Sequence, residues 1–217
     1  TVQSIVYDPD RSVIVLFSGE GGLDDTWEFD GVHWHEINPP HKPSGRSGFA
    51  ATWDAGPRRM MLFGGAGMAG NVNDETWFYD GTDWTYVAAD PYSPPDLYGH
   101  AMAYNTQEQT TVLYGGVESP YMSTETCLWD GQKWAGVDSP ANPGEIMSHC
   151  MAYMESLDGV VLHGGWQRDA PGGMNDKLWL FRDQTWNELN PPVIPGPKAG
   201  AEMVYDSIRE RLVLFGL

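Results

Sequence analysis

The segment NDETWFYDGTDW (73–84) holds the residue types of two kinds of binding site. Its four carboxylates and two indoles belong to Asp74, Glu75, Asp80, Asp83, Trp77 and Trp84. Carboxylates accept hydrogen bonds from sugar hydroxyls and coordinate calcium, and aromatic faces stack on sugar rings. Whether the segment is a site or part of the scaffold depends on whether it occurs once.

The segment recurs three times with constant aromatic spacing. The related stretches are LDDTWEFDGVHW (23–34), STETCLWDGQKW (123–134) and NDKLWLFRDQTW (175–186). In each, two anchor positions lie seven residues apart, as Trp77 and Trp84 do, with Cys127 replacing the first tryptophan in one copy. The carboxylates change position between copies. The anchors are therefore predicted to be packing residues, and the Asp80 position to belong to a turn.

A second element recurs five times, at intervals of 46, 51, 49 and 52 residues. It begins at an aromatic residue, and its apolar run ends ten positions later, directly before glycine in four copies and before Ser18-Gly19 in the first. The copies are YDPDRSVIVLFSG from Tyr7, WDAGPRRMMLFGG from Trp53, YNTQEQTTVLYGG from Tyr104, YMESLDGVVLHGG from Tyr153 and YDSIRERLVLFGL from Tyr205. Its apolar run, such as RMMLF (59–63), is typical of a strand covered on both faces. The chain is thus built from a repeat of about fifty residues.

Each repeat is expected to form four strands, which predicts an all-β chain. A strand of small residues such as GHAMAY (99–104) precedes the apolar strand, and the hairpin of the opening segment follows it. Asp80-Gly81 predicts a two-residue type I′ turn in that hairpin, as do Asp30-Gly31 and Asp130-Gly131. Proline-rich crossings such as NPPHKPSGR (38–46) lead to the next repeat.

Four-stranded units that repeat radially form a β-propeller. The glycine pair, the paired aromatics and YGHAMAY (98–104) resemble the kelch repeat, and the resemblance covers essentially the whole chain. Galactose-oxidase-type propellers share this repeat, whereas the sialidase Asp box does not fit because Val72 stands where it needs an aspartate. The resemblance implies four complete blades plus a two-stranded half blade, at residues 1–45, 46–96, 97–145, 146–197 and 198–217.

The half blade leaves three arrangements open. The chain could be part of a larger propeller, or a five-bladed ring with a two-stranded last blade. It could also self-associate, because the half blade would present unpaired backbone groups to another chain.

Propeller function usually lies on variable loops around the central channel. The loops between second and third strands vary, with 8, 12, 11 and 14 residues from the glycine pair to the third-strand anchor. This loop face resembles the partner-binding surface of kelch proteins, in which an arginine often stands at the place of Arg46. His163 is a further candidate, because it replaces an aromatic residue near the channel. The candidate ligand-binding residues are Arg46, Asn71, Glu118, Tyr121, His163, Trp166 and Arg168. This polar and aromatic set suits a protein, peptide or glycan ligand.

A binding scaffold without catalysis is therefore the main functional prediction, and a sugar-handling enzyme is the alternative. An oxidase- or epimerase-like site would lie in the central channel, but Cys127 and Cys150 do not match the copper site of galactose oxidase. A self-assembling structural module is the third possibility. His100 and His149, at equivalent positions, are predicted to be structural.

No cofactor is expected from the ligand spacings. The segment HWH (33–35) offers two imidazoles on one strand face without a third metal ligand. Glycine and aspartate alternate in GEGGLDD (19–25) and GGMND (172–176), but neither has the spacing of a known calcium loop.

The charge argues against two classes of partner. Thirty acidic and twelve basic residues give a net charge of −18, which repels nucleic acid and anionic membranes. No apolar run approaches membrane-spanning length, so membrane insertion is not expected. Two cysteines are too few for a disulfide framework, and both a cytoplasmic and a secreted location fit the chain.

Overall fold

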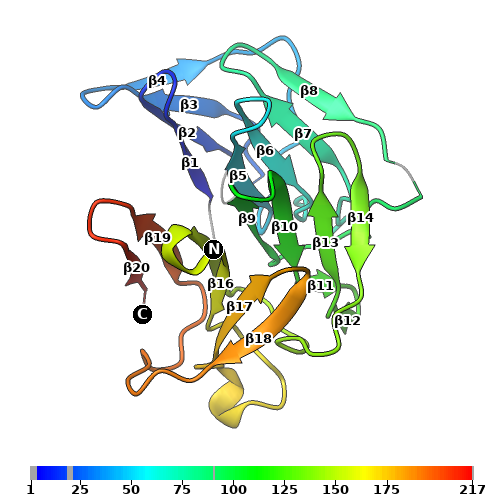
Figure 1. Ribbon diagram of the computed structural model, residues 1–217. Coiled ribbons are helices and arrows are strands. Elements are labelled where there is room, and N and C mark those ends of the chain that lie inside the picture. Colours follow the sequence, from blue (N-terminus) through cyan, green and yellow to red (C-terminus); the bar gives the residue numbers. More distant parts are fainter. Residues whose placement is uncertain (1–3, 19–21, 90, 217) are drawn as a thin grey trace.

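The computed structural model describes residues 4–18, 22–89 and 91–216 (Figure 1). Strands make up 45% of the chain and helices 3%, which confirms the all-β prediction. The two short 3-10 helices are η1 (Glu155–Leu157) and η2 (Pro171–Gly173).

Four antiparallel sheets of four strands follow one another along the chain. The first contains β1 (Ile5–Asp8), β2 (Val13–Phe17), β3 (Thr26–Phe29) and β4 (Trp34–Ile37). The second contains β5 (Ala50–Asp54), β6 (Arg59–Phe63), β7 (Thr76–Tyr79) and β8 (Trp84–Val87). The third contains β9 (Ala101–Asn105), β10 (Thr110–Tyr114), β13 (Thr126–Trp129) and β14 (Trp134–Val137). The fourth contains β15 (Cys150–Met154), β16 (Gly159–His163), β17 (Leu178–Arg182) and β18 (Thr185–Leu189).

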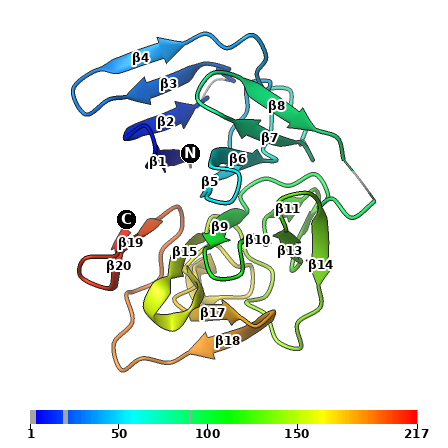
Figure 2. The same cartoon turned by 45° about the horizontal axis from the view of Figure 1, so that its top comes forward.

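Two further hairpins complete the description. β19 (Glu202–Asp206) pairs with β20 (Arg211–Phe215), and β11 (Val117–Glu118) pairs with β12 (Tyr121–Met122) inside the loop that joins β10 to β13. The first strands β1, β5, β9, β15 and β19 contact one another in that order, and the sheets fan outward from them (Figure 2). This arrangement is compatible with blades, but the described strands do not close into a ring.

The hydrophobic core lies between consecutive sheets. The second strands are buried on both faces, as predicted: Met60, Met61, Leu62 and Phe63 of β6 are each fully buried. Alternate side chains of such a strand belong to different clusters, with Met60 facing the first sheet and Met61 the third. Each large apolar side chain buried in this way contributes about 1.5–3 kcal/mol.

Fourth-strand tryptophans join each sheet to the preceding one. The indole N–H groups of three buried tryptophans donate to third-strand threonine hydroxyls at 3.0, 3.0 and 2.9 Å: Trp84 to Thr26, Trp134 to Thr76, and Trp186 to Thr126. The same rings pack against second-strand aromatics of the preceding sheet: Phe17, Phe63 and Tyr114. Their predicted packing role is confirmed. Trp34, at the same position of the first sheet, is 49% exposed because no described sheet lies on that side.

Backbone hydrogen bonds also link the sheets at the start of the first strands. The Gly99 N–H donates to the Gly48 carbonyl, the Ser148 N–H to Gly99, and the Gly200 N–H to Ser148, each at 2.7 Å. All four residues have φ between +54° and +71°, a conformation that favours glycine. Ser148 adopts it without being glycine.

The type I′ prediction is wrong for the three Asp-Gly turns. Tyr79 pairs directly with Trp84, so four residues lie in the loop, and of these only Gly81 has positive φ. The Asp80 carboxylate accepts the backbone N–H groups of Thr82 and Asp83 at 2.8 and 2.9 Å and thereby stabilises the wider loop. The loops after Asp30 and Asp130 are built in the same way. A two-residue turn with both residues at positive φ occurs instead in the fourth sheet, at Asp183-Gln184.

Candidate functional site

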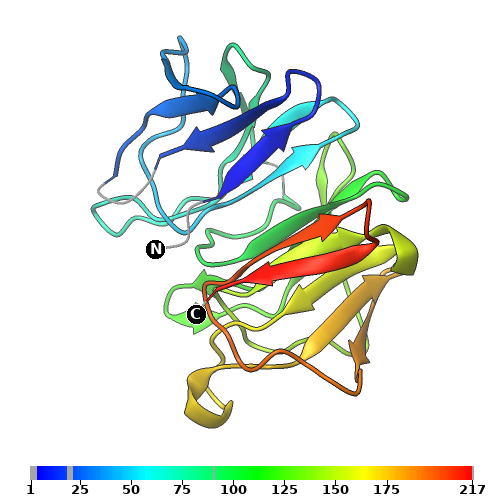
Figure 3. The ribbon, with the colours of Figure 1, turned by 90° about the vertical axis from the view of Figure 1, so that its left-hand side faces the viewer.

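The variable loops lie together at one end of the molecule. We call loops 66–75, 117–125 and 166–176 the loop face; they lie at the left of Figure 3, whereas the turns between first and second strands lie at the opposite end. Each loop begins with an antiparallel bridge to the residue stretch before a first strand: Ser47 with Ala66, Tyr98 with Val117, and Met147 with Trp166. The scaffold therefore fixes where each loop begins, while its tip differs in sequence. The predicted first loop, 20–25, lies partly outside the described residues.

The β11–β12 hairpin presents two of the candidates. Glu118 and Tyr121 form a cross-strand pair, and both side chains are exposed, Tyr121 by 73%. An exposed tyrosine beside a carboxylate provides an apolar surface and a hydrogen-bond acceptor on one loop.

Trp166 and Arg168 lie on the 166–176 loop, and Asn71 on the 66–75 loop; all three are exposed. Trp166 is 40% exposed although its backbone bridges both Met147 and Met174. The backbone is therefore fixed while much of the indole remains open to solvent.

Arg46 is placed differently from these loop residues. Its side chain is fully buried and donates to Glu75 Oε2 at 2.5 Å, to the Gly64 carbonyl at 3.2 Å and to both the carbonyl and hydroxyl of Ser44 at 2.9 Å. The Glu75 pKa is lowered: burial raises it, but the hydrogen bonds from Arg46 and Trp77 outweigh that effect. The guanidinium thus holds the start of the second repeat against its own loop, and its proposed contact with a ligand stays a prediction.

His163 is buried away from the central cavity that it was expected to approach. The ring is only 1% exposed, and its Nδ1 lies 3.2 Å from the Lys177 carbonyl. It occupies the position of Phe63 and Tyr114, which pack on a tryptophan of the following sheet. Burial lowers the pKa of His163.

The central cavity has a volume of about 420 Å³ and is lined by all five first strands. Small side chains such as Ala50, Ala101 and Ala152 contribute to its wall. Aromatic residues at one equivalent position of the five strands also line it: Tyr7, Trp53, Tyr104, Tyr153 and Tyr205. Glu202 is a carboxylate that the sequence interpretation missed, and burial raises its pKa.

His100 and His149 lie at equivalent positions of this lining and are buried. Neither ring has a well-formed hydrogen bond to a described residue. Burial lowers the pKa of His100 to about 4 and that of His149 to about 3. Both imidazoles are therefore neutral at pH 7.

A second pocket, of about 580 Å³, opens where the 91–95 crossing passes the third sheet. Its wall combines proline-rich chain with strand residues Cys127 and Gly136, and its carboxylates are Glu118, Glu125 and Asp138. Of the candidates, only Glu118 lines it. The sequence signal that could have located this pocket is the replacement of the anchor tryptophan by Cys127.

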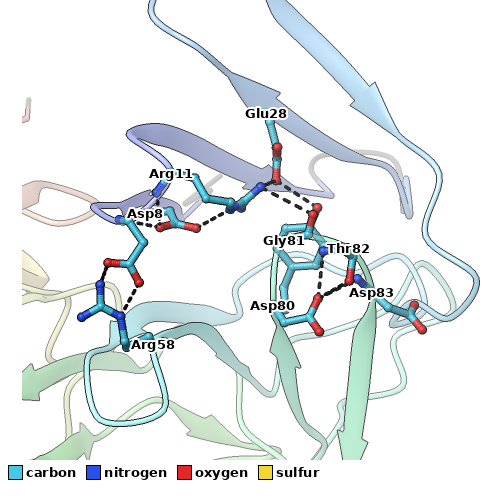
Figure 4. Close-up of polar contacts among 10 residues, drawn as sticks. Asp8, Arg11, Glu28, Arg58, Asp80, Gly81, Thr82 and Asp83 are labelled. Atoms are coloured by element: carbon cyan, nitrogen blue, oxygen red, sulfur yellow. Dashed lines mark hydrogen bonds and ion pairs between the residues drawn. The ribbon is translucent and has the colours of Figure 1, made fainter.

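An ionic cluster joins the β1–β2 turn to strand β3 and the β7–β8 turn (Figure 4). Arg11 donates to Asp8 at 2.7 Å, to Glu28 at 2.6 Å and to the Gly81 carbonyl of the β7–β8 turn at 3.5 Å. Tyr79 donates to the same Glu28 at 2.9 Å. Because these groups satisfy one another, the cluster ties the first sheet to the second.

The described residues contain no group of three or more histidine, cysteine, aspartate or glutamate side chains arranged to hold a metal ion. In the HWH segment, the His33 and His35 rings lie 6.4 Å apart, and His35 Nε2 is 2.9 Å from Asp30. Part of the GEGGLDD segment, residues 19–21, lies outside the described residues. Cys127 and Cys150 are buried free thiols.

Comparisons with known proteins add no family. No protein-family model matches the chain, and a search of curated proteins finds no relative. Among the described residues, no helix has the length and apolar character needed to cross a membrane.

Proposed function

We propose that the chain is a kelch-like β-propeller, with the four sheets as complete blades and β19–β20 as a half blade. In this proposal it acts as a non-catalytic binding scaffold that holds a protein, peptide or glycan on the loop face. The fold part is supported by four sheets of one strand order whose first strands contact each other in sequence around one cavity.

One observation carries the binding proposal. The sheets repeat the same tryptophan–threonine junction, whereas the loops at one end differ in length and carry exposed Tyr121, Trp166 and Arg168. Variable polar and aromatic loops on a rigid scaffold are typical of recognition surfaces.

The positions of His163 and Arg168 support the enzyme alternative less than the binding scaffold. A catalytic centre in the channel would bring His163 and Arg168 to one pocket with acidic side chains. Instead His163 is buried against the Lys177 carbonyl and Arg168 is exposed on the loop face. Neither lines the central cavity.

Glycan and peptide arrays test the proposal. We expect a ligand whose binding is weakened about tenfold by Tyr121→Ala or Trp166→Ala, since each removes an exposed aromatic contact worth over 1 kcal/mol in a binding centre. Trp34→Ala is the matched control, because Trp34 is a similarly exposed indole on an outer strand rather than on the loop face. A protein that binds nothing on either array, or whose ligand responds only to Trp34→Ala, contradicts the proposal.

A further inference from the structure

The third sheet lacks a ring that the other three sheets have. The first anchor position holds Trp27, Trp77 and Trp179 in those sheets, but Cys127 in the third. The residue paired with it across the hairpin is also smaller than in the second sheet: the Tyr86 ring packs against Trp77 at 5.4 Å between centroids, whereas Gly136 pairs with Cys127. The 580 Å³ pocket lies at this place, with Cys127 and Gly136 in its wall.

The acceptor for the missing ring is still present. Two residues before the anchor, a carboxylate accepts the indole N–H in the first two sheets: Asp25 from Trp27 at 2.6 Å and Glu75 from Trp77 at 3.0 Å. Glu125 stands at the same position relative to Cys127 and lines the pocket. Within residues 4–18, 22–89 and 91–216, its carboxylate has neither a hydrogen bond nor an ion pair.

The charge of the pocket indicates which groups a ligand would carry beside an aromatic ring. Glu118, Glu125 and Asp138 line it, and no lysine or arginine does so among the described residues. Carboxylates of this kind favour a cationic ligand through charge-assisted hydrogen bonds. Cys127 adds no charge, since burial, with a further contribution from nearby Glu125, raises the pKa of its thiol to about 12.

We propose that this pocket binds the tryptophan side chain of a basic peptide segment of a partner protein. The indole takes the place that Trp77 fills in the second sheet, with its N–H donated to Glu125, and neighbouring lysine or arginine residues pair with Glu118 and Asp138. Pro91 and Pro94 of the crossing supply apolar surface beside the ring. The inference rests on the proposed function, because Glu118 connects the pocket to the loop face.

The shape of the pocket favours a peptide over a free amine. It is open along the surface, and its volume lies within the usual range of about 300–1,000 Å³ for ligand sites, more than one indole requires. The remaining space suits the residues that flank a tryptophan.

The test uses the unlabelled N-acetyl Lys-Trp-Lys amide peptide, which keeps both lysine charges, and isothermal titration calorimetry. We expect the unaltered protein to bind it, with weaker binding at high salt, and to bind the Lys-Ala-Lys and Glu-Trp-Glu peptides at least about tenfold less tightly. Cys127→Trp/Gly136→Tyr restores the side-chain pair of the second sheet, fills the pocket and lowers affinity about tenfold or more. Glu125→Gln keeps the shape and lowers affinity several-fold, whereas Glu155→Gln, on the β15–β16 connection, leaves it unchanged.

Several outcomes overturn the inference. These are no binding of Lys-Trp-Lys, equal binding of Lys-Ala-Lys, equal affinity of the Glu125→Gln variant, or tryptamine binding as tightly as the peptide. Circular dichroism and thermal melting verify that the double variant folds, and Glu125→Gln provides the test if it does not. One outcome separates the two proposals. If an array ligand depends on Trp166 but binds the double variant with unchanged affinity, then the loop face binds a ligand and this pocket is not its tryptophan site.

Discussion

The indole Nε1 of Trp134 donates to the Thr76 hydroxyl at 3.0 Å across the junction between the second and third sheets. Both groups are buried, and the Trp134 ring lies 5.3 Å from that of Phe63, so one side chain provides both a polar and an apolar contact to its neighbour. The same relationship recurs at two other junctions. It explains why the seven-residue spacing is constant: a shift of one residue would turn the indole to the opposite face of its sheet.

Thr76→Val tests the polar half of this junction. Valine keeps the shape of threonine but leaves the buried indole N–H without an acceptor, which costs about 1–3 kcal/mol. Urea unfolding should show that loss of stability. Thr124→Val is the control, because Thr124 is exposed. If both variants lose the same amount, the hydrogen bond does not stabilise the junction.

Trp84→Ala and Trp34→Ala compare the buried and exposed members of one repeat position. Trp84 is fully enclosed between the first two sheets, so its truncation should cost about 3–5 kcal/mol, as for other buried aromatics. Trp34→Ala should cost well under half as much, because the ring is already half exposed. Thermal melts of both variants measure the difference. Equal costs would show that another part of the protein covers Trp34 in solution.

The repeat could be predicted from the sequence because its signals are local and occur several times. Apolar runs and tryptophan spacing located the strands and the buried anchor Trp84 correctly. The turn was missed because Asp-Gly fits both a two-residue turn and a wider loop, and the choice depends on the Asp80 carboxylate reaching two backbone N–H groups.

The candidate site was harder to predict because burial depends on neighbouring sheets. Trp166 and Tyr121 are exposed, as a loop position suggests. Arg46 is instead enclosed where the first repeat meets the second, by Ser44 and Glu75, and His163 is enclosed by the fourth sheet and the chain after it. The pocket at Cys127 was missed for a related reason. Cys127 was interpreted as a buried anchor that replaces tryptophan. Because its partner Gly136 is also small, the two positions together leave space for a pocket.

Arg46→Leu places an apolar residue where two other repeats have Leu97 and Ile146. We expect a loss of about 2–3 kcal/mol at pH 7, less than the 3–5 kcal/mol of a fully buried pair because Glu75 is partly exposed. The Glu75 pKa is lowered in the folded protein, so this stabilisation is present above the ordinary glutamate pKa and is lost as the pH falls through the folded value.

Urea titrations at pH 7 and at acidic pH measure the Arg46 effect. The difference between the variant and the unaltered protein should shrink as the pH falls from the ordinary glutamate pKa through the lowered pKa of folded Glu75. Lys42→Met breaks an exposed pair with Asp24 and should cost no more than about 1 kcal/mol at either pH. A cost for Arg46→Leu that is independent of pH would mean that packing, not the ion pair, accounts for it.

His100 and His149 should make the fold sensitive to mild acid. Their folded pKa values, about 4 and about 3, lie below the ordinary histidine value because burial disfavours the charged ring. Between about pH 6.5 and pH 4 the unfolded chain therefore binds protons that the folded chain does not, and stability falls with pH by about 1.4 kcal/mol per pH unit for each histidine. Above pH 7 both states are neutral and this contribution is constant.

His149→Phe provides the measurement, since Phe49 occupies the equivalent buried position of the second sheet. The slope of unfolding free energy against pH should fall by about 1.4 kcal/mol per pH unit between pH 6 and pH 5, and the variant should resist acid better than the unaltered protein. His33→Gln, which removes an exposed histidine, is the matched control. An unchanged slope in His149→Phe would show that the ring takes up its proton without unfolding, through water that enters from the central cavity.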